Sequence, residues 1–172
     1  MEEFTNETID TKQLPRYESV ELTSLHKNYW KVLLINNAII FSIIAIVMIF
    51  LWMNVEDSQE FSPFLVFGIF LVIVNVSFFL NRISFKKKAY AFRNHDVIYR
   101  SGLIATNTMV IPYNRVQHVA LHEGFLSRYF GLAKVEIFTA GGSASDIEIP
   151  GIAKEEAENI KQLLMGKIQK QL

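Results

Sequence analysis

The chain of 172 residues contains no cysteine. It therefore cannot form a disulfide, use a thiolate nucleophile, or hold zinc or an iron–sulfur cluster through cysteine. The sequence also lacks a phosphate-binding loop, a dinucleotide fingerprint, a zinc-protease pattern and a nucleophile elbow. We accordingly predict no catalytic residue and no cofactor, and expect that the protein is not an enzyme.

Charged residues are absent from two long apolar runs, residues 32–53 and 61–80. A hydrocarbon core about 30 Å thick needs about 20 apolar residues in a helix that rises about 1.5 Å per residue. Each run meets that length, and only residues 54–60 separate them. The sequence therefore predicts an integral membrane protein with a two-helix transmembrane hairpin over residues 32–80.

Basic residues are absent from the connecting loop 54–60, which carries three acidic residues. Both outer flanks are basic, with Lys27 and Lys31 before the first run and Arg82 after the second. Lysine and arginine close to the ends of a span are retained on the cytoplasmic side. We expect a multi-pass protein of the cytoplasmic (inner) membrane, with both termini and the C-terminal domain in the cytoplasm and the loop 54–60 outside.

Polar residues inside the spans fall at matching depth, with Asn36 and Asn37 early in the first run and Asn75 late in the second. The simpler interpretation is an interhelical amide hydrogen bond, which contributes about 0.6–2 kcal/mol in a membrane. The alternative is part of a transport path, although an ion path usually needs ionisable groups, which both runs lack. Two helices could enclose a pore only by oligomerising, and a homo-oligomer is left open.

The hairpin divides two polar segments. Residues 1–31 read as a polar tail leading to a short interfacial stretch, because Pro15 blocks a continuous helix. Residues 84–170 read as a soluble α+β domain. Alternating apolar and polar residues with turn residues at the breaks predict about six antiparallel strands. We place them at residues 88–93, 97–100, 109–113, 116–122, 133–139 and 146–149, with a short helix at 125–130 and an amphipathic helix at 153–168.

Three motifs follow one another in the soluble domain: residues 111–117 (IPYNRVQ), 127–132 (SRYFGL) and 135–141 (VEIFTAG). Their order and position behind a hairpin resemble the bacterial membrane-flanked pleckstrin-homology-like (PH-like) family. The resemblance implies a curved antiparallel sheet or barrel capped by the C-terminal helix. It also implies a non-enzymatic, membrane-tethered module, with related PH-like membrane proteins among its candidate protein partners. The motif positions singled out are Pro112, Arg115, Gly131 and Gly141.

Lys86, Lys87, Lys88 and Arg93 are candidate contacts with the membrane surface. Each basic residue near anionic lipid contributes about 1 kcal/mol, although fixing the topology is the simpler role of the lysines. His118 and His122 share one strand face without a third ligand, so no metal site is predicted. Nucleic-acid binding is not expected either, because the basic excess lies against the membrane.

These observations favour a membrane-anchored module that binds or scaffolds protein partners at the cytoplasmic face. Two alternatives remain open from the sequence: a module that binds anionic lipid, and an accessory subunit of a membrane transport or export complex.

Overall fold

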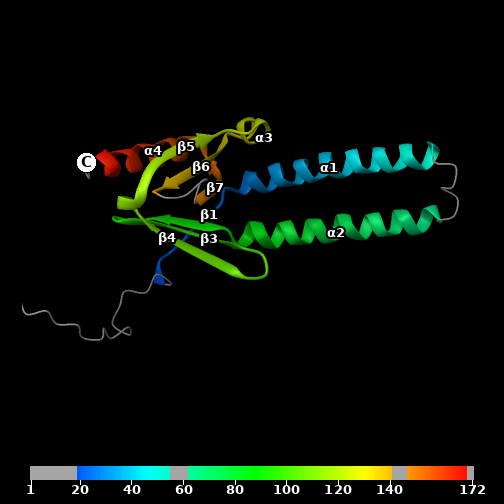
Figure 1. Ribbon diagram of the computed structural model, residues 1–172, viewed down its shortest axis with the longest axis horizontal. Coiled ribbons are helices and arrows are strands. Elements are labelled where there is room, and N and C mark those ends of the chain that lie inside the picture. The colour runs from blue at the N-terminus through cyan, green and yellow to red at the C-terminus, as the bar shows by residue number, and fades with distance from the viewer. Residues whose placement is uncertain (1–18, 55–61, 141–146, 170–172) are drawn as a thin grey trace, which may run out of the picture.

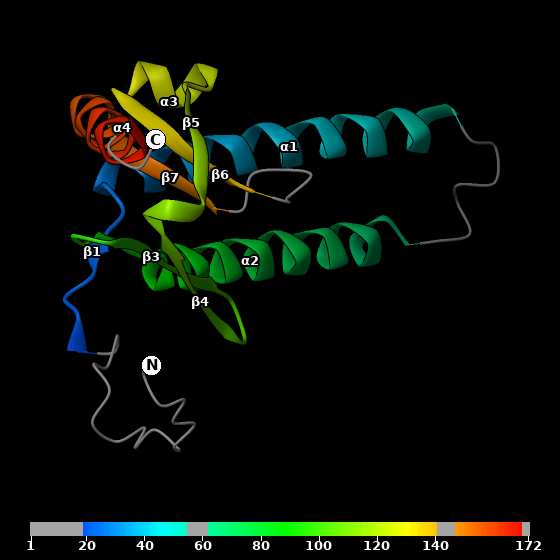
Figure 2. The ribbon, with the colours of Figure 1, turned by 60° about the vertical axis from the view of Figure 1, so that its left-hand side comes forward.

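Two long antiparallel helices lie side by side and carry a domain of strands at one end (Figures 1 and 2). The computed structural model describes residues 19–54, 62–140 and 147–169. Both helices are long and apolar enough to cross a membrane, and few of their side chains are buried, as expected for surfaces that face lipid. They are α1 (Lys27–Asn54) and α2 (Pro63–Lys87).

Both helices extend beyond the predicted apolar runs at the domain end. The first helix begins at Lys27 rather than at residue 32, and the second ends at Lys87 rather than at residue 80. The additional turns are held by the domain, because Tyr29 and Phe85 pack against its core. The apolar runs therefore identified the part of each helix that meets lipid, but not the part that meets protein.

The first sheet has four antiparallel strands in the order β1-β2-β3-β4. Its first strand precedes the hairpin in the chain: Thr23 pairs with Tyr90, and Ser24 pairs with Ala89. The transmembrane hairpin is thus inserted between two neighbouring strands of one sheet, which the sequence analysis did not anticipate. The strands are β1 (Thr23–Ser24), β2 (Ala89–Phe92), β3 (Asp96–Gly102) and β4 (Thr106–Pro112).

The second sheet has three antiparallel strands in the order β5-β6-β7, and α4 packs across all three. A 3-10 helix connects the first sheet to the second, and a short α-helix lies between β5 and β6 (Figure 1). The elements are η4 (Tyr113–Arg115), β5 (Val116–His122), α3 (Phe125–Tyr129), β6 (Leu132–Thr139), β7 (Ile147–Ala153) and α4 (Lys154–Gln169).

One core lies between the two sheets and α4. Alternation along β6 and β7 directs one face of each strand inward, and three residues at helical spacing in α4 cover them. A bulge between Val116 and His118 shifts the phase of β5, so that Val116 and Val119 are both buried. The buried residues of β6, β7 and α4 include Val135, Ile137, Ile147, Ile149, Ala157, Ile160 and Leu164. The predicted fold class, a membrane hairpin with an α+β domain, is confirmed.

Candidate functional site at the hairpin–domain junction

Both helices join the domain through very short connections. Leu25 and His26 alone separate β1 from α1, and Lys88 alone separates α2 from β2. Leu25 is buried in the core, and the His26 N–H donates to the Gly151 carbonyl at 2.9 Å. The Lys88 N–H donates to the Ser84 carbonyl at 3.2 Å. The first connection is thus hydrogen-bonded to β7, and the short second connection limits how far α2 can move relative to β2.

Tyr29 in the first turn of α1 rests directly on Gly151 of β7. Gly151 has φ +67°, and a Cβ atom built there would lie 2.4 Å from Tyr29 Cγ. Glycine is therefore required at this position for two reasons: the left-handed backbone and the close approach of the Tyr29 ring. The sequence did not predict this contact, because it joins segments far apart in the chain.

Aromatic rings hold the two helices together next to the domain. The Trp30 ring meets Phe78 edge-on at a centroid distance of 5.5 Å and lies 5.8 Å from Phe85. The Arg82 guanidinium stands 4.8 Å above the Trp30 ring. Such a cation–π contact contributes about 0.5–1 kcal/mol at exposed sites and more when desolvated. This aromatic cluster fixes the helix pair where it enters the domain.

The candidate surface lysines differ in their surroundings. Lys86 is exposed, whereas Lys87 Nζ donates to the Leu103 carbonyl at 2.6 Å. Lys88 is half-buried, and this burial lowers its pKa. The structure thus brings these lysines together at the junction and gives one of them a partner in the domain. Their contact with lipid stays a prediction.

Arg93 lies apart from the lysines, at the turn between β2 and β3. Its Nε and Nη2 atoms donate to the Asp96 carboxylate at 2.6 and 2.5 Å. That hydrogen bond raises the pKa of Arg93. Near it, Lys167 in the last turns of α4 donates to the Asn94 carbonyl at 3.0 Å. This turn is at the end of the domain away from the hairpin (Figure 1), so a role of Arg93 at the membrane surface stays a prediction that its position does not favour.

The asparagines of the spans take different environments. The Asn75 amide donates to the Leu71 carbonyl of its own helix at 2.8 Å. Asn36 is exposed, and Asn37 is half-buried. Satisfaction of the Asn75 amide within α2 lowers the cost of placing it in lipid. An interhelical contact of these three residues stays a prediction.

The motif positions have structural surroundings in the domain. Pro112 ends β4, and the hydroxyl of the next residue, Tyr113, donates to the Arg93 carbonyl at 2.6 Å. Burial raises the pKa of Tyr113 to about 12. Arg115 is exposed, while its carbonyl accepts from the Ala140 N–H at 3.1 Å. These contacts close the corner between the two sheets.

Gly131 adopts φ +65° at the turn into β6, and its carbonyl accepts from the Lys154 N–H at 2.9 Å. Gly141 lies outside the described residues. The His118 ring stacks on Phe138 at a centroid distance of 4.1 Å. Within the described ranges, no three metal-binding side chains come together.

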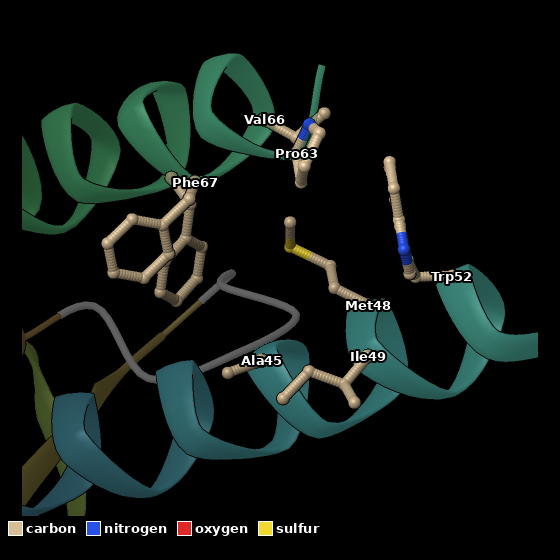
Figure 3. A pocket seen from close by; sticks show the side chains of 8 residues that line it. Ala45, Met48, Ile49, Trp52, Pro63, Val66 and Phe67 are labelled. Atoms are coloured by element: carbon tan, nitrogen blue, oxygen red, sulfur yellow. The ribbon is translucent and has the colours of Figure 1, made fainter. Parts of the chain in front are cut away.

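The far ends of the two helices leave a space of about 230 Å³ between them. Figure 3 shows Met48 and Trp52 of α1 facing Pro63 and Phe67 of α2 across it. Every residue that lines this space is apolar. It suits a hydrocarbon chain or another apolar helix rather than an ion.

Residues 31–168 match the family described as "Bacterial PH domain". UPF0699 transmembrane protein YdbS of Bacillus subtilis (strain 168) is 31% identical over 84 residues, which are 49% of this chain and 51% of that protein. UPF0699 transmembrane protein YdbT of the same strain is 29% identical over 86 residues, 49% of this chain and 17% of that protein. The matched part thus spans about half of the first relative and less of the second. No solved structure matches the chain significantly.

Proposed function

This chain belongs to the bacterial PH domain family, and on that premise we propose that it is a non-enzymatic adaptor that binds protein partners at the cytoplasmic face of the membrane. The resemblance drawn from its motifs is confirmed by the family match. That it is a membrane protein is supported by the two apolar helices and by relatives named as transmembrane proteins.

The observation that carries the proposal is the outer edge of the first sheet. In the part of the chain that the structure describes, β4 is the last strand of that sheet and pairs only with β3. Thr106, Asn107, Val110 and Pro112 of β4 are exposed. An edge strand offers backbone donors and acceptors to an extended segment of a partner, which can pair with it as an added strand.

The rigid junction supports the same proposal. A domain fixed to its spans presents β4 at a constant height and direction above the bilayer. A partner that is itself held in the membrane then meets this edge without the entropic cost of ordering a linker. Related PH-like membrane proteins are therefore the partners that we propose first.

Co-purification of full-length protein with a longer PH-like membrane protein from the same genome, in mild detergent, tests the proposal. Val110→Lys places a charge on the β4 edge, where charged residues discourage strand pairing. Gln162→Lys adds the same charge at an exposed position of α4 and serves as the matched control. We expect Val110→Lys to reduce recovery of the partner at least fivefold and Gln162→Lys to leave it unchanged.

Equal recovery with both variants would refute the edge as the binding surface, and no recovery with the unsubstituted chain would refute this class of partner. A reporter fused after Leu172 checks the orientation. It should be active in the cytoplasm only; activity in the periplasm would overturn the cytoplasmic placement.

A further inference from the structure

Three large apolar side chains of the domain stand almost fully in the open. Ile104 is 94% exposed, Phe125 is 90% exposed and Tyr129 is 83% exposed. The other exposed large apolar residues described outside α1 and α2 are Val110, Leu163 and Met165, and none of these exceeds 45%. Single exposed apolar residues are ordinary on a soluble surface, but the three extreme ones share a location.

All three lie at the end of the domain from which the hairpin projects. Phe125 and Tyr129 belong to α3, which contacts α1, and Ile104 occupies the β3–β4 turn beside α2 (Figures 1 and 2). The bond from Lys87 Nζ to the Leu103 carbonyl ties that turn to the end of α2. α3 and the turn therefore flank the hairpin on its two sides.

The height of the β3–β4 turn matches the surface of the bilayer. Residues 81–87 of α2 extend about 10 Å beyond the apolar run, at about 1.5 Å per residue. The headgroup layer on each side of a bilayer is about 5–8 Å thick. The β3–β4 turn reaches back alongside the last turns of α2 (Figure 1), so Ile104 lies at the depth of the headgroups.

We propose that Ile104, Phe125 and Tyr129 enter the boundary between headgroups and acyl chains of the bilayer that the hairpin spans. Aromatic rings are favoured at this boundary, and burial of apolar side chains there stabilises binding at the interface. The partner is the lipid surface itself, without selectivity for a particular headgroup. The domain then rests on three supports: the hairpin, the tip of the β3–β4 turn and α3.

This contact differs from the lysine-based lipid binding considered from the sequence. It uses apolar side chains, so it should persist at high salt and on uncharged lipid, whereas lysine binding is screened. It is also independent of the proposed protein partners, which would meet the β4 edge.

The absence of cysteine makes a direct test straightforward. Ile104→Cys, Phe125→Cys and Asn94→Cys would each be made in the full-length protein, labelled with an environment-sensitive nitrobenzoxadiazole dye and reconstituted into phosphatidylcholine vesicles. Asn94 lies in the β2–β3 turn, and β3 separates this turn from Ile104 by about 20 Å, at about 3.3 Å per residue. Lipids with a nitroxide high on the acyl chain serve as quenchers.

We expect quenching at positions 104 and 125 to be at least threefold stronger than at position 94, at both low and high salt. Water-like emission at positions 104 and 125, with quenching equal to that at 94, would overturn the proposal.

A second variant separates insertion from misfolding. Ile104→Asp combined with the label at position 125 should weaken quenching of that label at least twofold, because one support of the domain is lost. Leu163→Asp, at an exposed apolar position of α4, is the matched control and should leave it unchanged. Both positions are exposed, so the melting temperature in detergent should change little. If Ile104→Asp lowers the melting temperature without changing the quenching, the side chain has a structural role and the proposal fails.

Discussion

The contact between Tyr29 and Gly151 provides the sharpest test of how the hairpin is attached. We predict that Gly151→Ala destabilises the domain much more than the same change at Gly131. Both glycines have a left-handed backbone, with φ +67° and +65°. A Cβ atom at Gly131 would meet nothing within 4 Å, whereas one at Gly151 would lie 2.4–2.9 Å from three atoms of the Tyr29 side chain.

The expected magnitudes follow from these two differences. A non-glycine residue in the left-handed region destabilises the fold by about 1–2 kcal/mol, and this cost applies to both variants. Carbon atoms pack normally at about 3.5–4.0 Å, so Tyr29 must leave its site when Gly151 gains a methyl group. Loss of the packing of a large side chain adds about 2 kcal/mol. We therefore expect a loss of about 3–4 kcal/mol for Gly151→Ala and about 1–2 kcal/mol for Gly131→Ala.

Hydrogen exchange of the slowest amides of β6, in mild detergent, measures the free energy of unfolding for each variant. A double-mutant cycle with Tyr29→Ala isolates the steric part. In the Tyr29→Ala background, Gly151→Ala should cost only about 1–2 kcal/mol, because the left-handed backbone remains and the collision is gone. Equal costs in the two backgrounds, or equal costs for the two glycines, would show that Tyr29 does not pack on Gly151.

Further predictions concern the core and two titratable groups. Tyr113→Phe should cost about 1 kcal/mol at neutral pH, because the hydrogen bond to the Arg93 carbonyl is lost. Burial raises the pKa of Tyr113 to about 12. This residue therefore contributes stability that is complete below pH 10 and is lost as the pH rises toward 12. In a series of denaturation experiments over that pH range, the free energy of unfolding should decline less steeply for Tyr113→Phe than for the unsubstituted protein. Leu164→Ala, at a fully buried position of α4, should cost about 2–5 kcal/mol, and an unchanged melting temperature would contradict the packing of α4 on the sheet. Burial lowers the pKa of Lys88 and so disfavours its charged form. Lys88→Gln should therefore raise the melting temperature slightly at neutral pH. A lower melting temperature would show that the charge of Lys88 is needed at the junction.

The local patterns of the sequence predicted the parts of the fold that depend on neighbours in the chain. The spans followed from the absence of charge, and α4 followed from the spacing of Ala157, Ile160 and Leu164. The strands β5 and β6 followed from alternation, to within a residue of their bounds.

What the sequence could not predict depends on contacts between distant segments. β1 is only two residues long, too short for an alternating pattern, and its partner β2 lies beyond the whole hairpin. The need for glycine at position 151 comes from a ring in α1. The exposure of Ile104, Phe125 and Tyr129 at the hairpin end of the domain could not be predicted either, because the sequence does not distinguish these residues from apolar residues of the core.

The insertion of the hairpin between β1 and β2 has a consequence for biosynthesis. β1 leaves the ribosome before the two spans, and the strand that it needs leaves after them. If one span failed to insert, the two strands would end on opposite sides of the bilayer, leaving the first sheet a strand short and its core without Leu25. A chain in which one span has crossed the bilayer and the other has not therefore cannot complete its first sheet.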